Sequence, residues 1–180
     1  MASSASQSHL WGMRAAYLLI GLALLFLQLL PLDTAPGGWF GPDFVIALTF
    51  VWIARRPEYV PVLSVAFLFL LADLLLQRPP GLMSALAILA TEALRARTDD
   101  IREIFFPSEW AIVGAFICGL YVIYLIAWSI LMPFDIAYGL VLLQMLLTVL
   151  AYPLVVLAST ALFTMVSSTT RAPDAPGGKL

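Results

Sequence analysis

The stretch FLLADLLLQRPPGL, residues 69–82, places one aspartate in an apolar run that ends at a Pro-Pro pair. A carboxylate in the hydrocarbon of a bilayer costs at least about 2.5–3.5 kcal/mol, so Asp73 needs a partner or a place near the membrane surface. The prolines stop one helix, and a second apolar run begins at Gly81. The stretch therefore predicts the end of one membrane helix and the start of the next.

The composition extends this interpretation to the whole chain. The 180 residues are 62% hydrophobic and 11% charged, whereas a soluble domain has about 45–50% apolar and about 25% charged residues. Too little polar surface exists to cover a soluble globule, so we expect an all-α integral membrane protein. A net charge of −2 argues against a nucleic-acid partner. With one cysteine, one histidine and no HExxH, CxxC or Walker motif, we expect neither a metal nor a cofactor.

Six apolar runs are candidate membrane spans, since a spanning helix needs about 20 apolar residues. The second run is short, and it could cross only by recruiting flanking residues and thinning the bilayer, or it could be re-entrant. The six runs cover residues 15–30, 44–54, 59–76, 81–94, 110–132 and 136–166.

Loop charges support six spans. With the N-terminus in the cytoplasm, only Arg78 falls outside, and the other arginines and the lysine fall inside. This is the bias that orients membrane proteins. We therefore expect a single six-transmembrane-helix bundle over residues 14–168 with both termini cytoplasmic. The small, polar tails, residues 1–13 and 169–180, are expected to be disordered. The inner charges are Arg14, Arg55, Arg56, Arg95, Arg97, Arg102, Arg171 and Lys179.

Asp73 lies about 9 Å beyond the middle of its helix, toward the outer surface. Arg78, five residues later, could pair with it. Three roles stay open: a carboxylate that reaches headgroups or caps a neighbouring helix, a pin for the bundle or a partner, and proton or ion transport. Transport relays usually need several intramembrane ionisable groups. Glu92 lies near the opposite face, beside Arg95, so the two acids cannot form a catalytic pair. Asp43 and the acids of residues 95–110 are expected to be loop charges.

A row of small residues marks the fifth run. Ala111, Ala115 and Gly119 recur at i, i+4 and i+8 and form one flat helix face. Membrane helices associate through such faces, because small side chains let backbones approach closely. We expect the row to receive another helix, from this bundle or from a partner protein.

Three stretches, in this order, resemble the MreD family, the rod shape-determining membrane proteins of bacteria. They are GPDFVIALTFVWIARRPEYVP (41–61), AFLFLLADLLLQRPPGLMSALAILA (66–90) and YPLVVL (152–157). The positions that carry the resemblance are Pro42, Asp43, Trp52, Arg56, Pro57, Asp73, Gly81, Ala85, Leu86, Tyr152 and Pro153. The stretch preceding Asp73 departs from the family, which often has Gly-Leu where this chain has Phe69-Leu70.

The resemblance implies a non-enzymatic scaffold, multi-pass in the bacterial cytoplasmic (inner) membrane. MreD-like proteins work with MreC, a protein with one span, with the actin-like MreB filament, and with the RodA glycosyltransferase and its transpeptidase partner. Together these proteins elongate the peptidoglycan side wall and maintain rod shape. Membrane lipid would be the remaining partner.

Two other classes compete with the scaffold. The substrate-binding subunit of an energy-coupling-factor vitamin transporter has a similar fold of about six helices, which the MreD family resembles. Such subunits use small residues on the first helix to engage their coupling partner, and Ala16, Gly21 and Ala23 give no regular row. A polar outer pocket is also hard to find. An intramembrane enzyme would need paired acids or a Ser/His set at one depth, which this sequence lacks.

Overall fold

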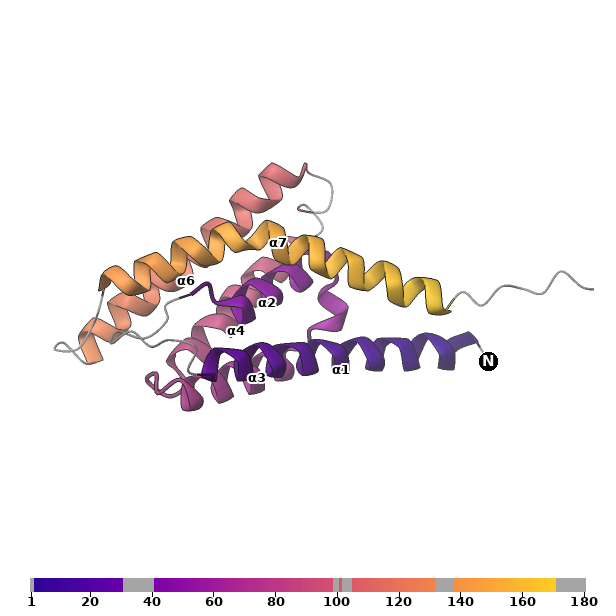
Figure 1. The fold of residues 1–180 in the computed structure, drawn as a ribbon, viewed down its shortest axis with the longest axis horizontal. Coiled ribbons are helices and arrows are strands. Elements are labelled where there is room, and N and C mark those ends of the chain that lie inside the picture. The colour runs from indigo at the N-terminus through magenta and orange to yellow at the C-terminus, as the bar shows by residue number, and fades with distance from the viewer. Residues whose placement is uncertain (1, 31–40, 99–100, 102–104, 132–137, 171–180) are drawn as a thin grey trace, which may run out of the picture.

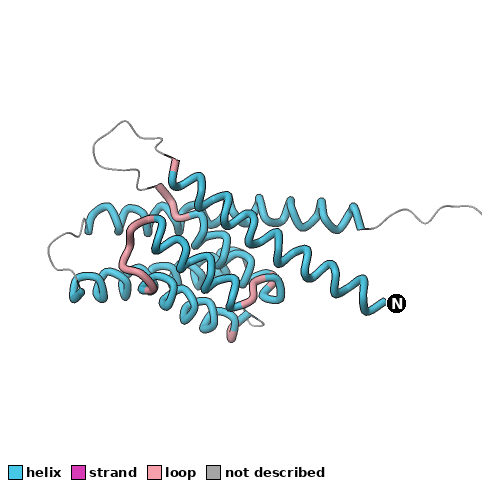
Figure 2. Tube along the Cα trace, turned by 90° about the horizontal axis from the view of Figure 1, so that it is seen from below, coloured by secondary structure: helices cyan, strands magenta, loops and turns pink. Residues whose placement is uncertain are grey.

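A computed structural model describes residues 2–30, 41–98, 101, 105–131 and 138–170 of the chain. Every regular element in these residues is a helix, and no strand occurs among them (Figures 1 and 2). This confirms the all-α class.

Each of the six apolar runs coincides with a helix, because prolines, glycines and charges separate the runs. The start of α1 and the end of α7 lie at the same end of the bundle (Figure 1). The helices are α1 (Ala2–Leu29), α2 (Phe44–Arg55), α3 (Val62–Leu75), α4 (Leu82–Arg95), α6 (Phe106–Leu131) and α7 (Tyr138–Thr170), with a 3₁₀ turn η1 at Pro57–Tyr59.

Three of these helices, α1, α6 and α7, are long and apolar enough to cross a membrane by length and composition. The apolar helices α2 and α3 are shorter, with 12 and 14 residues. At 1.5 Å per residue, α2 is only about 18 Å long, against a hydrocarbon core of about 30 Å. The described residues therefore indicate a membrane protein with three long helices and three shorter ones.

The N-terminal segment differs from the expectation of a disordered tail over residues 1–13. Helix α1 begins at Ala2 and continues without a break into the apolar run. The segment contains no proline, and its Ala, Ser and Gln residues allow the helix to extend backward from the apolar turns. At the other end, α7 continues to Thr170, and the remaining predicted tail lies outside the described residues.

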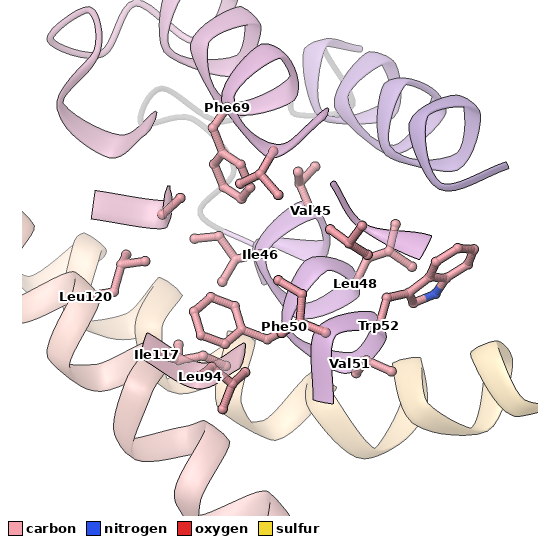
Figure 3. Packing of buried hydrophobic residues seen from close by; sticks show 14 of the residues in the cluster. Val45, Ile46, Leu48, Phe50, Val51, Trp52, Phe69, Leu94, Ile117 and Leu120 are labelled. Carbon is pink, nitrogen blue, oxygen red and sulfur yellow. The ribbon is translucent and has the colours of Figure 1, made fainter. Parts of the chain in front are cut away.

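Helix α2, the shortest run, forms the centre of the bundle. All ten residues Val45–Ala54 are buried, and α2 contacts α1, α4, α6 and α7. Figure 3 shows its side chains surrounded by Phe69 of α3, Leu94 of α4 and Ile117 of α6. Because other helices surround α2, it does not have to match the thickness of the bilayer. The large apolar side chains on α1, α6 and α7, such as Leu19, Ile130 and Leu157, are exposed and suit a lipid environment.

Candidate functional site

The two ends of α2 hold most of the buried polar groups that carry the resemblance. We call them the Asp43 end and the Arg55 end. At about 18 Å, α2 is shorter than a hydrocarbon layer of about 30 Å. The free backbone groups of its first and last turns need hydrogen-bond partners, which the protein must supply wherever water is excluded.

At the Asp43 end, one carboxylate closes the helix start. Asp43 is 2% exposed, and its Oδ1 accepts a hydrogen bond from the backbone N–H of Ile46 at 3.2 Å. Its own N–H donates to Oγ1 of Thr148 on α7, at 2.9 Å. The Arg78 guanidinium binds its Oδ2 at 3.3 Å. Asp43 is thus a buried helix cap rather than the loop charge we expected, and Pro42 leads directly into it.

Asp73 acts in a second cap beside the first. It is fully buried, and its Oδ2 accepts hydrogen bonds from the N–H groups of Gly81 and Ser84, both at 3.1 Å. These donors are free because they begin α4. The spacing of eight residues between Asp73 and Gly81 therefore carries the chain around the Pro-Pro turn and back to the carboxylate.

This geometry selects among the roles left open for Asp73. Capping of a neighbouring helix is confirmed, whereas the expected pair with Arg78 is wrong, because the arginine side chain turns to Asp43. Gly81 has a φ of +84°, in the left-handed region that favours glycine. Glycine at this position thus suits the turn, and its backbone N–H donates one of the two hydrogen bonds to Asp73.

Several buried polar atoms beside this pair of caps lack a hydrogen-bond partner among the described residues, including Oδ1 of Asp73 and the Tyr121 hydroxyl. The Tyr124 hydroxyl and the Trp128 indole nitrogen are buried without a hydrogen-bond partner among the described residues. Their rings pack edge to face at 5.3 Å on α6. The Asp43 end therefore has unsatisfied hydrogen-bond donors as well as paired charges.

At the Arg55 end, a carboxylate of α6 joins three helices. Glu109 is 8% exposed, and its Oε2 binds the Arg55 guanidinium at 3.1 Å. Its Oε1 accepts a hydrogen bond from the Tyr152 hydroxyl of α7 at 2.8 Å. The sequence reasoning missed Glu109, because we expected the helix to begin at Trp110. It begins at Phe106, so Glu109 lies in the first turn, where the helix dipole favours a negative charge.

The motif residues Arg56 and Pro57 close α2 at this end. The Arg56 N–H donates to the carbonyl of Trp52 at 2.6 Å, and Pro57 opens η1. The carbonyls of Pro57 and Val60 accept hydrogen bonds from the Arg95 guanidinium at 3.1 and 2.6 Å. Arg95 also pairs with Glu92 at 3.0 Å, as expected, so α4 is tied to the turn.

Trp52, another position that carries the resemblance, lies in the core of the bundle. It is fully buried, and its indole N–H donates to Oγ of Ser159 on α7 at 3.2 Å. Its ring contacts those of Tyr17, Tyr59 and Phe163. The residue lies near a helix end, but that end is inside the bundle.

The small-residue row on α6 points away from the bundle. Ala111 and Ala115 are exposed, and a methyl group added at Gly119 would meet nothing within 4 Å. The inward face of α6 instead carries larger side chains and Gly114, where an added methyl group would lie 3.4 Å from Val149 of α7. An intramolecular role for the row is therefore wrong for the described residues, and the role toward a partner stays a prediction. Pro153 lies within α7, next to Tyr152.

The polar groups at both ends hold helices together. Each of the buried carboxylates of Asp43, Asp73 and Glu109 binds groups from other parts of the chain. Among the described residues, no group of three His, Cys, Asp or Glu side chains could hold a metal ion. A scan of protein-family models, a search of curated proteins and a search of solved structures find no match for this chain.

Proposed function

We propose that the chain is a non-enzymatic, MreD-like scaffold of the cell-wall elongation machinery, in the cytoplasmic membrane of a bacterium. One observation carries the proposal: several positions of the resemblance build the two ends of α2 and the neighbouring start of α4. Asp43 and Asp73 cap two helices, Tyr152 binds Glu109, and the Arg56-Pro57 pair closes α2. These residues hold the bundle in one shape, which is what a scaffold requires.

The proposed topology has six spans and cytoplasmic termini. The arginines at the Arg55 end, among them Arg55, Arg56 and Arg95, would face the cytoplasm, as the positive-inside bias requires. The shorter helices α2, α3 and α4 pack inside or against the long ones, so local thinning of the bilayer would complete their spans.

The proposed partners are an MreC-like protein with one span, an MreB-like filament, and RodA with its transpeptidase. The outward row Ala111, Ala115 and Gly119 supports a docking face for a partner helix, because small residues allow close helix contact. Depletion of the protein in a rod-shaped host is expected to round the cells, and unchanged shape with normal wall growth would contradict the proposal.

A matched pair of variants tests the docking face. Ala115→Trp is expected to reduce co-purification of the MreC-like partner in detergent, because the indole separates the two helices. Leu131→Trp, at an exposed position on the other side of the same helix, is the control and should leave this co-purification unchanged. Equal recovery of the partner by both variants would exclude this face.

The second candidate is the substrate-binding subunit of a vitamin transporter. The unsatisfied donors of Tyr124 and Trp128 at the Asp43 end favour it, because a polar ligand could bind them. Gly21 argues against it, since a methyl group added there would meet Leu68 of α3 at 2.5 Å, so this small residue faces inward. A vitamin bound to the purified protein, detected by native mass spectrometry, would favour the transporter.

A further inference from the structure

A groove of about 440 Å³ lies between α1, α2 and α7, and its lining residues all belong to these three helices. Ile20 and Leu24 of α1 form one wall, and α2 forms the floor. The second wall belongs to α7. The residues of the floor and second wall are Phe44, Leu48, Trp52, Leu154, Val155, Ala158, Ser159 and Leu162.

The lining of this groove is almost entirely apolar. The two polar groups that reach it bond to each other, because the Trp52 indole N–H donates to Oγ of Ser159 at 3.2 Å. The groove therefore offers no free donor to a sugar, a nucleotide or another polar ligand. Its occupant must be apolar along the length of the groove, since a polar group enclosed there would lose its hydrogen bonds.

The length and apolar lining of the groove suit a single hydrocarbon chain. Phe44 and Trp52 are eight residues apart on α2, which makes the floor about 12 Å long. An extended acyl chain can follow a floor of this length from end to end.

The Arg55 end of the groove carries positive charge. Trp52 is the last floor residue at this end, and Arg56, which caps α2, donates its backbone N–H to the Trp52 carbonyl at 2.6 Å. The Arg56 side chain is 55% exposed, with a long contact of 3.7 Å to Glu58. Arg14 of α1 binds the Glu58 carbonyl at 3.1 Å and brings a second guanidinium to the same turn. Two arginines against one carboxylate leave a net positive charge.

We propose that the groove binds one acyl chain of an anionic phospholipid, with the headgroup phosphate held by Arg56. An anionic headgroup meets the positive turn, and the chain covers the apolar wall. Guanidinium groups bind phosphate oxygens through paired hydrogen bonds. This inference requires only that the protein lies in a membrane and is independent of the partners proposed above.

Native mass spectrometry of the full chain in detergent tests both halves of the site. The protein is titrated with phosphatidylglycerol or phosphatidylcholine carrying identical acyl chains. Wild type is expected to retain one phosphatidylglycerol more tightly than phosphatidylcholine. Arg56→Gln should remove most of this preference, about fivefold, because one basic residue near an anionic lipid contributes roughly that much. Arg97→Gln, an exposed arginine outside the groove, is the control.

The acyl chain is tested separately with Ala158→Trp, which fills the groove from α7. It should weaken retention of both lipids by about tenfold or more, since several methylene groups lose their contacts. Ala161→Trp, at an exposed alanine of the same helix outside the lining, should leave the retention of both lipids unchanged. Circular dichroism establishes that all variants are folded. Equal affinity of wild type for the two lipids, or equal retention by the two tryptophan variants, would overturn the proposal.

Discussion

The two ends of α2 satisfy their free backbone groups with different side chains. At the Asp43 end, aspartates cap helix starts, and Arg78 balances one of them. At the Arg55 end, arginines serve the helix end: Arg55 pairs with Glu109, and Arg95 binds the carbonyls that follow α2. Free N–H groups attract carboxylates and free carbonyls attract cations, so the chemistry of each end follows from the helix direction.

The ends also differ in how deeply their charges are buried. The side chains of Arg78 and Asp43 are 15% and 3% exposed, against 31% and 11% for Arg55 and Glu109. The stability of the Asp43 end is therefore expected to depend more on its ion pair. An unpaired charge costs more folding free energy where less water can reach it. The Asp43 end is thus expected to be the more fragile of the two.

The largest effect is expected from Arg78→Met. Loss of the guanidinium leaves the Asp43 carboxylate buried without its charge partner, which typically costs about 3–5 kcal/mol. Arg55→Met is the matched change and should cost less, because Glu109 keeps the Tyr152 hydrogen bond and is closer to water. Unfolding in detergent, followed by circular dichroism, measures both. Equal losses of stability in the two variants would contradict the proposed difference between the two ends.

The next largest effect is expected from Asp73→Ala, with a loss of about 2–3 kcal/mol, because it removes a cap and leaves one buried and one partly buried N–H group unsatisfied. Asp73→Asn keeps an acceptor oxygen and should cost about 1 kcal/mol or less. The same unfolding assay compares them. If alanine and asparagine behaved like wild type, the capping hydrogen bonds would contribute nothing.

A smaller effect is expected at the Arg55 end. Tyr152→Phe removes only the hydroxyl that donates to Glu109, and a hydrogen bond to a charged group contributes about 1.5–3 kcal/mol. We expect the lower part of this range, since Arg55 still pairs with the carboxylate. Tyr138→Phe, an exposed tyrosine of the same helix, is the control. An equal loss of stability in the control would show that the hydrogen bond to Glu109 is not the cause.

The smallest effect concerns the turn itself. Gly81→Ala should cost about 1 kcal/mol, because an L side chain resists a positive φ even where space is open. Gly119→Ala is the matched change in the helix interior of α6, also with open space around it, and should be neutral or slightly stabilising. If Gly81→Ala stabilised the protein and Gly119→Ala destabilised it, the result would contradict a left-handed turn at Gly81.

The sequence predicted much of the fold, because apolar runs, prolines and charges are local signals. All six runs coincide with helices, and the turn between Asp73 and Gly81 lies where the Pro-Pro pair placed it. The depth of each helix in the bundle was harder to predict. Length alone made α2 the doubtful span, yet the surrounding helices make it the core.

The partners of the buried charges were largely unpredictable. Arg78 is five residues from Asp73 and binds Asp43, 35 residues away. Glu109 binds groups 54 and 43 residues away, so no spacing in the sequence links them. The row of Ala111 and Ala115 was correctly recognised as a helix face, but its direction depends on which residues fill the bundle more tightly.

Amide hydrogen exchange of the whole protein in lipid nanodiscs tests the central claim most directly, namely that α2 is a buried helix closed at both ends. Residues 44–55 are expected to exchange more slowly than α4, although α2 is shorter than α4, because neighbouring helices surround its backbone hydrogen bonds. Exchange of α2 faster than that of α4, as a re-entrant segment near water would show, would contradict the account.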